Sequence, residues 1–247
     1  MPTMPKATGN SAPKAISNIP LAETILSVLL QRIYDGVLAP GAHINEAMIA
    51  EEFKVSRGPV REAMRRLQGL QLITRAPYLK ARVVELTQEE ARELFEMRLA
   101  LEGVACRLAA ERMTAEEIQE LVHELEQDRQ RTLVGNNELA GKPSTDAPKV
   151  FDFHERIVRG SRNGRIIDAL CGDLYHLLRI YRRRSGMVAE RKSQAYAEHW
   201  QILRAIKARD GELAESLMRS HVGRAAEHLF TTDLPHLTGD VGDSRPA

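Results

Sequence analysis

Apolar residues recur every three or four positions in the first third of the chain, which is the period of an amphipathic helix. In "LAETILSVLLQRIYDG", residues 21–36, they form one stripe that ends at Gly36, so the pattern predicts a first helix. A second helix is predicted after Asn45, a favourable N-cap. A third is predicted after Ser56, because Pro59 then falls in the first helical turn, where proline is tolerated.

Two short runs rich in β-branched residues follow the third helix, at 73–75 and 82–84. A proline-containing turn with Lys80 near its tip separates them, so this segment predicts a β-hairpin. Three short helices followed by a hairpin make a winged helix-turn-helix, and we place this domain at residues 20–86.

The rest of the chain carries helical patterns without a strand pattern between them. Two capping boxes, Thr87-x-x-Glu90 and Thr114-x-x-Glu117, each begin a long apolar-periodic run. We expect an all-α antiparallel helical bundle over residues 87–230, with a core that can host a ligand. Its later helices are predicted near 149–160, 165–185, 188–208 and 211–229.

Composition fits two compact units with aperiodic ends. The 247 residues are 43% apolar, and residues 1–19 and 231–247 are expected to be mobile tails. The sequence has no run of twenty apolar residues and no apolar core of a secretory signal near its start, so we expect a soluble cytoplasmic protein without membrane contact.

Cys106 and Cys171 lack CxxC spacing, and buried free thiols are favoured over a bridge.

The net charge of +1 conceals an uneven distribution. Residues 1–85 carry 11 Lys and Arg against 7 Asp and Glu, a balance of +4, which leaves 24 against 27, or −3, for the rest. Between Lys54 and Arg82 the ratio is eight to one. A basic segment on a nearly neutral chain indicates a local anionic partner, and nucleic acid is the leading candidate.

The third predicted helix concentrates its arginines on one side. At about 100° per residue, Arg57, Arg61 and Arg65 fall within about 80° of one another, on an arc separate from the apolar residues. Such a face suits double-stranded DNA, because an arginine fork binds guanine or phosphate; a merely solvated basic face is the alternative. The predicted DNA-binding residues are Ser56, Arg57, Arg61, Arg65, Arg66, Arg75 and Lys80.

Four histidines of the helical region are regularly spaced. His154, His176, His199 and His221 lie 22, 23 and 22 residues apart, one on each successive predicted segment. In an antiparallel bundle such residues meet in one layer, where imidazoles can share a divalent metal. The alternative is that each is an ordinary core or surface histidine.

Several of these segments resemble a known family. "GAHINEAMIAEEFKVSRGPVREAMRRLQGLQLITR" is similar to the DNA-binding domain of the GntR family of bacterial transcriptional regulators. "ELFEMRLALEGVACRLAA", "FHERIVRGSRN" and "EHWQILRAIKARDGELAESLMRSH" resemble, in order, the FCD effector domain of its FadR-type subfamily. The resemblance implies a homodimer that binds an operator in double-stranded DNA and responds to a small-molecule effector. It departs at the hairpin turn, where the family usually has glycine and this chain has "PYLKAR".

The resemblance also implies a metal held by one aspartate and three histidines. His154, His199 and His221 match the histidines, but the position of the aspartate is Val150. Asp152 lies about 200° round a helix from His154 and does not readily replace it. Three imidazoles still suit zinc or nickel, with an open position for water or an effector carboxylate. His176 is outside this set and is interpreted as pocket lining or core.

Effectors of this subfamily are frequently small organic acids, so we expect a carboxylate. The candidate effector-binding residues are Arg98, His176 and Arg179. Arg98 lies one turn before Glu102 and is either an internal ion pair or an effector clamp. The triplet 182–184 is expected to be solvated. A metal-dependent enzyme is the alternative function, but it lacks a clear general base and leaves the basic helix unexplained, so a non-enzymatic regulator is favoured.

Overall fold

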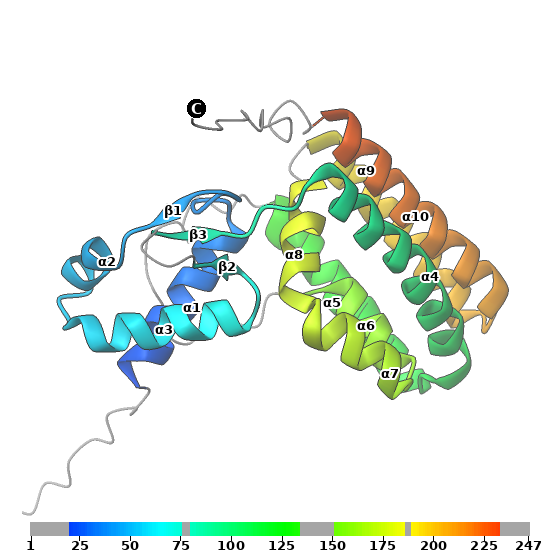
Figure 1. Ribbon diagram of the computed structural model, residues 1–247. Helices are drawn as coiled ribbons and strands as arrows, with labels where there is room; N and C mark the ends of the chain where they lie inside the picture. The colour runs from blue at the N-terminus through cyan, green and yellow to red at the C-terminus, as the bar shows by residue number, and fades with distance from the viewer. Residues whose placement is uncertain (1–19, 76–79, 134–150, 186–188, 233–247) are drawn as a thin grey trace, which may run out of the picture.

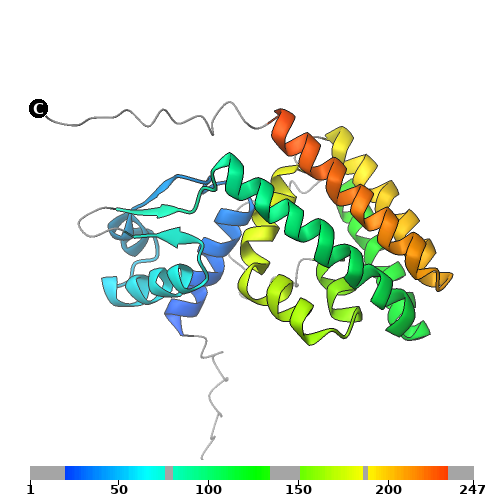
Figure 2. The ribbon, with the colours of Figure 1, turned by 45° about the vertical axis from the view of Figure 1, so that its right-hand side comes forward.

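The computed structural model describes residues 20–75, 80–133, 151–185 and 189–232 (Figures 1 and 2). Residues 1–19, the tip of the hairpin turn, Val150 and residues 233–247 lie outside these residues, whereas residues 231 and 232, expected in the C-terminal tail, belong to the last helix. Within the described residues, every helix is either too short or too polar to cross a membrane.

The N-terminal part is a winged helix-turn-helix. Its elements are α1 (Leu21–Tyr34), β1 (His43–Ile44), α2 (Glu46–Glu52), α3 (Arg57–Gly69), β2 (Ile73–Thr74) and β3 (Ala81–Val83). The antiparallel sheet has the order β1-β3-β2, with Ile73 opposite Val83 and Ile44 opposite Ala81. The strand β1 was not predicted, because two residues are too few to show an alternating pattern.

The helices of this part pack through the predicted apolar stripes. Ile25, Leu29 and Ile33 of α1 are buried, as are Val60, Met64 and Leu67 of α3. The Asn45 side chain accepts hydrogen bonds from the backbone N–H groups of Ala47 and Met48 and so caps α2, as predicted. Ser56 occupies the N-cap position of α3, but its side chain makes no capping hydrogen bond.

The C-terminal part is an all-α bundle. Its helices are α4 (Gln88–Arg112), α5 (Ala115–Leu133), α6 (Phe153–Gly160), α7 (Gly164–Ile167), α8 (Tyr175–Ser185), α9 (Ala189–Lys207) and α10 (Gly211–Thr232). Both predicted capping boxes are present, at Thr87 with Glu90 and at Thr114 with Glu117. The long helices α4 and α10 run side by side in both views.

Two predicted helix boundaries were wrong. The helix expected from about 149 begins at Phe153, because the Asp152 side chain caps it there. The single helix expected over 165–185 is divided into α7, a π-helical turn at Asp168–Asp173, and α8. Apolar residues continue through this turn, so the sequence pattern does not mark the division.

The two parts meet where α8 packs against α1 (Figure 1). The Tyr34 hydroxyl at the end of α1 hydrogen-bonds to His176 Nδ1, and the Arg179 guanidinium lies 4.2 Å from the centre of the Tyr34 ring. On the same helix, the Tyr181 hydroxyl accepts a hydrogen bond from the backbone N–H of Leu86, in the segment that joins the wing to α4.

Candidate nucleic-acid interface and histidine cluster

The arginines of α3 point away from the domain core. The side chains of Arg61 and Arg65 are 65% and 73% exposed, and Arg57 and Ser56, at the start of the helix, are also exposed. The opposite side of α3 is buried against α1, so sequence and packing together assign the arginines to the solvent side. Whether these side chains contact DNA stays a prediction.

Acidic residues pair with some of these arginines. Arg65 pairs with Glu62 on its own helix, and Arg66 pairs with Glu23 of α1, which turns Arg66 toward the neighbouring helix. Arg75, just after β2, donates to Glu46 at 2.6 Å. These contacts are exposed to solvent and each contributes at most about 1 kcal/mol.

Arg57 and Lys80 have no acidic partner among the described residues. Together with Arg75 they line a hollow of about 180 Å³ between α2, α3 and the sheet. Five cations predicted to bind DNA therefore lie around one edge of the domain, on the solvent side of α3 and at the wing: Arg57, Arg61, Arg65, Arg75 and Lys80.

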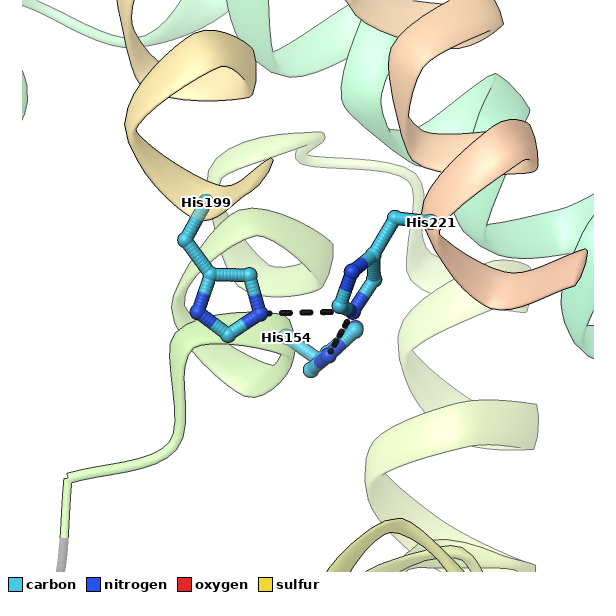
Figure 3. Close-up of side chains that lie close together, drawn as sticks. All are labelled: His154, His199 and His221. Atoms are coloured by element: carbon cyan, nitrogen blue, oxygen red, sulfur yellow. Dashed lines mark hydrogen bonds between the residues drawn. The ribbon is translucent and has the colours of Figure 1, made fainter. Parts of the chain in front are cut away.

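Three of the four spaced histidines gather in the helical part (Figure 3). His154 comes from α6, His199 from α9 and His221 from α10. The Nε2 atom of His221 lies 3.3 Å from that of His199 and 3.3 Å from that of His154, and one ring nitrogen of each residue lies within 4.8 Å of the others. His176 does not join them, because it contacts Tyr34 at the junction of the two parts.

Two carboxylates contact the Nδ1 atoms of His154 and His221, on the sides of these rings that face away from the cluster. His154 Nδ1 lies 2.6 Å from a carboxylate oxygen of Glu102, and His221 Nδ1 lies 2.5 Å from one of Glu198. An ionised carboxylate only accepts hydrogen bonds, so both Nδ1 atoms carry the proton. The Nε2 atoms of neutral His154 and His221 are then both acceptors that face each other at 3.3 Å, and a cation placed between them would satisfy both.

Burial keeps these rings neutral. It lowers the pKa of His221 to about 4, against the opposing effect of Glu198, and lowers the pKa of His199 well below its usual range. The pKa of His154 is also lowered, mainly by burial, although Glu102 opposes the shift. At neutral pH all three residues therefore have the form that ligates metals.

A buried network of charges surrounds the cluster. Glu102 accepts from Arg98 Nε at 2.8 Å and from Arg182 at 2.9 Å, and Asp152 accepts from Arg182 at 3.1 Å. Burial opposes the ionisation of Glu102, but the two arginines and His154 hold its pKa well below its usual range. Arg98 is 1% exposed and pairs with Glu102. This is the internal ion pair, which was one of the two roles predicted for Arg98.

The expectation that Arg182 is solvated was wrong. Its side chain is only 11% exposed, because it pairs with Glu102 of α4 and with Asp152, the residue that caps α6. Arg191 is also buried, pairs with Glu198 at 3.0 Å, and donates to the backbone oxygen of His221. Sequence reasoning assigned no function to Glu198, whose only signal was its position directly before His199.

Asp152 is not directed at the histidine cluster. Its carboxylate accepts from the backbone N–H groups of His154 and Glu155 and pairs with Arg182; because Asp152 is the extended N-cap residue of α6, this capping, and not a helical angle, directs its side chain. His176 and Arg179, predicted to bind an effector, lie on the side of α8 that contacts Tyr34. Cys106 is buried and Cys171 is partly exposed, both as free thiols.

Comparisons with known proteins agree with this architecture. The family described as "Bacterial regulatory proteins, gntR family" matches residues 21–78, and the FCD domain matches residues 93–224. The HTH-type transcriptional regulator YdhC of Bacillus subtilis is 30% identical over 207 residues, which are 81% of this chain and 87% of that protein. A probable D-xylose utilization operon transcriptional repressor of Paenarthrobacter nicotinovorans is 28% identical, over 85% of this chain and 88% of its own.

Solved structures show the same fold. McbR/YncC of E. coli has a TM-score of 0.66 at 23% identity, covering 86% of this chain and 98% of that one. A putative GntR regulator from Rhodococcus sp. RHA1 has a TM-score of 0.68 at 21% identity, covering 85% and 98%. The chain therefore belongs to the GntR family of bacterial transcriptional regulators, as a DNA-binding protein with an FCD effector domain and not an enzyme.

Proposed function

We propose that the protein binds its operator as a homodimer, with Arg57 and Arg61 nearest the bases. Arg65 then contacts the DNA backbone, and Arg75 and Lys80 contact it from the wing. The observation that carries this proposal is the position of these side chains on the solvent side of α3 and at the sheet beside it. A helix of this kind enters the major groove, and two copies related by a two-fold axis read two half-sites.

The test is a titration of the full chain with duplex DNA. An operator is first selected from a random duplex library, and its Kd is then measured by fluorescence anisotropy over a range of salt concentrations. We expect log Kd to depend steeply on log salt, because several phosphates are neutralised. The double variant Arg57→Ala, Arg61→Ala should lose operator preference, whereas Arg165→Ala, an exposed arginine of the helical part, should not. Full operator preference in the double variant would contradict the assignment.

We propose further that His154, His199 and His221 hold a divalent metal. Nitrogen ligands at about 2.0–2.1 Å from a tetrahedral zinc lie roughly 3.3 Å apart, which is the separation of the paired Nε2 atoms here. Glu102 and Glu198 orient two of the rings, as carboxylates commonly do in metal sites. When bound, zinc or nickel would offer an open coordination position to an oxygen ligand.

The proposed effector is a small carboxylate. Buried nitrogens beside the cluster support this class, because Arg98 Nη1 and Arg191 Nε have no hydrogen-bond partner among the described residues. A buried donor without an acceptor costs about 1–3 kcal/mol, and more when it is charged. A carboxylate supplies two acceptor oxygens and a compensating charge, so its binding would satisfy such donors. His176 and Arg179 are not included, because they contact Tyr34.

Elemental analysis of the untagged protein, with calorimetric titration of the metal-stripped form by zinc, nickel and manganese, tests the metal. We expect binding near one equivalent that is lost in His199→Gln. Melting temperatures with a panel of mono-, di- and tricarboxylates then test the effector class, and operator binding with each hit tests regulation. An absence of metal and of binding heat would contradict the metal proposal and mark Val150 as the reason.

A further inference from the structure

One acidic residue lies among the cations of the candidate DNA-binding surface. Glu46 is the first residue of α2, directly after the cap residue Asn45. Its Oε1 accepts from Arg75 Nη2 at 2.6 Å, and its Oε2 lies 3.9 Å from Arg61 Nε. The Glu46 side chain is 19% exposed, and those of Arg75 and Arg61 are 43% and 65% exposed.

Glu46 thus connects the two elements that would touch DNA. Arg61 belongs to α3, and Arg75 follows the first strand of the wing. Glu46 is also the one carboxylate among the described residues that line the hollow between Arg57, Arg75 and Lys80. A negative charge at this place repels phosphates, so it weakens any binding that depends on charge alone.

We propose that Glu46 is a positioning residue that sets sequence specificity by orienting Arg75 and Arg61. This inference rests on the proposed DNA-binding function. A guanidinium binds a guanine edge through two parallel hydrogen bonds and must be correctly oriented, whereas a phosphate accepts it from many directions. A carboxylate that fixes the guanidinium therefore favours reading of bases and disfavours contacts with phosphates elsewhere on the DNA.

The experiment compares two duplexes of equal length and composition, the selected operator and a scrambled sequence, with the full-length protein. The measured quantity is the specificity ratio, which is the Kd for the scrambled duplex divided by the Kd for the operator. In Glu46→Gln we expect tighter binding of the scrambled duplex and a ratio that falls about tenfold, the size of one bidentate arginine–guanine contact. Because one repulsive charge is removed, the salt slope for the scrambled duplex should increase by up to about 0.9.

Matched variants separate positioning from charge and from folding. Glu51→Gln removes an exposed carboxylate of the same helix that has no ion pair among the described residues, and it should leave the ratio unchanged. Glu46→Asp keeps the charge and should restore part of the specificity. In an Arg75→Ala background, Glu46→Gln should change the ratio little, because the main partner is already absent.

Three results would overturn the proposal. The first is an unchanged ratio in Glu46→Gln, and the second is an equal fall in Glu51→Gln. The third is a Glu46→Gln variant that binds both duplexes equally less tightly and has a lower melting temperature. Failure of the proposed function looks different, because the unaltered protein would then show no operator preference. If Glu46→Gln does not fold, Glu46→Asp and Arg75→Ala still measure the dependence of specificity on this contact.

Discussion

His221 donates its Nδ1–H to Glu198 across 2.5 Å, and this contact determines which ring nitrogen faces the other two histidines. Glu198 also accepts from Arg191 and Arg224, so its carboxylate is held from three directions. Burial alone would raise the pKa of Glu198, but its hydrogen bond with His221 and the nearby arginines lower it to about 2. The acceptor therefore stays ionised throughout the neutral range.

Replacing Glu198 by Gln should weaken metal binding without removing a ligand. The amide can still contact His221 but accepts its proton less strongly, so the ring is less well oriented and less basic. Loss of such a partner typically costs 10–100-fold in affinity. Calorimetry with zinc on the metal-stripped protein measures this effect.

The control for this prediction is Glu227→Gln, an exposed carboxylate on the same helix as His221. Its zinc affinity should equal that of the unaltered protein. Equal affinities of Glu198→Gln and the unaltered protein would show that the orientation of His221 does not depend on this contact.

Removing Arg182 should destabilise the protein strongly. In Arg182→Ala, the buried carboxylates of Glu102 and Asp152 lose a common partner, and unpairing a buried charge costs about 3–5 kcal/mol. Urea denaturation gives the free energy of unfolding. The exposed Arg165→Ala should change it by no more than about 0.5 kcal/mol. A similarly small change in both variants would restore the solvated interpretation of Arg182.

Acid should weaken the contact between the two parts of the chain. Burial, and then the positive charge of Arg179, lower the pKa of His176 in the folded protein. The unfolded chain therefore binds this proton more readily, and the contribution of His176 to stability is complete above its usual pKa of about 6.5 and is lost as pH falls through the lowered value. The groups that face this ring are Tyr34, Tyr175 and Arg179.

The measurement is the free energy of unfolding at pH 7.5 and pH 5.5 for the unaltered protein and for His176→Gln. Other groups also titrate, so the prediction concerns the difference, and the variant should lose less stability on acidification. His123→Gln, a replacement of an exposed histidine, should behave like the unaltered protein. Identical pH dependence in His176→Gln and the unaltered protein would contradict the prediction.

Local patterns predicted most of the fold. The stripe containing Ile25, Leu29 and Ile33, the cap at Asn45 and the box at Thr87 each depend on residues within a few positions of one another. Such short-range signals determine where helices begin and which side of each is buried. The histidine spacing predicted one layer of four, but only three of them meet, because His176 contacts Tyr34 instead; the set of three was the one that the family resemblance implied.

Contacts between distant residues could not be predicted in this way. The pairing of Glu102 with Arg182 spans 80 positions, and that of Tyr34 with His176 spans 142. Both depend on where α8 lies, and α8 follows a π-helical turn that the apolar pattern does not mark. A π-helical turn changes the direction of the side chains that follow it, so the sequence pattern before the turn does not indicate which side of α8 is buried.

The helix α8 has a mechanical consequence for regulation. Arg182 pairs with Glu102 beside the histidine cluster, and two other residues of the same helix, His176 and Tyr181, contact Tyr34 of α1 and the backbone of Leu86 before α4. About 9 Å of helix axis separates Arg182 from His176, and a helix is too stiff to absorb a displacement over that length. A ligand that displaced α8 through Arg182 would therefore also displace the residues through which this helix contacts the DNA-binding domain.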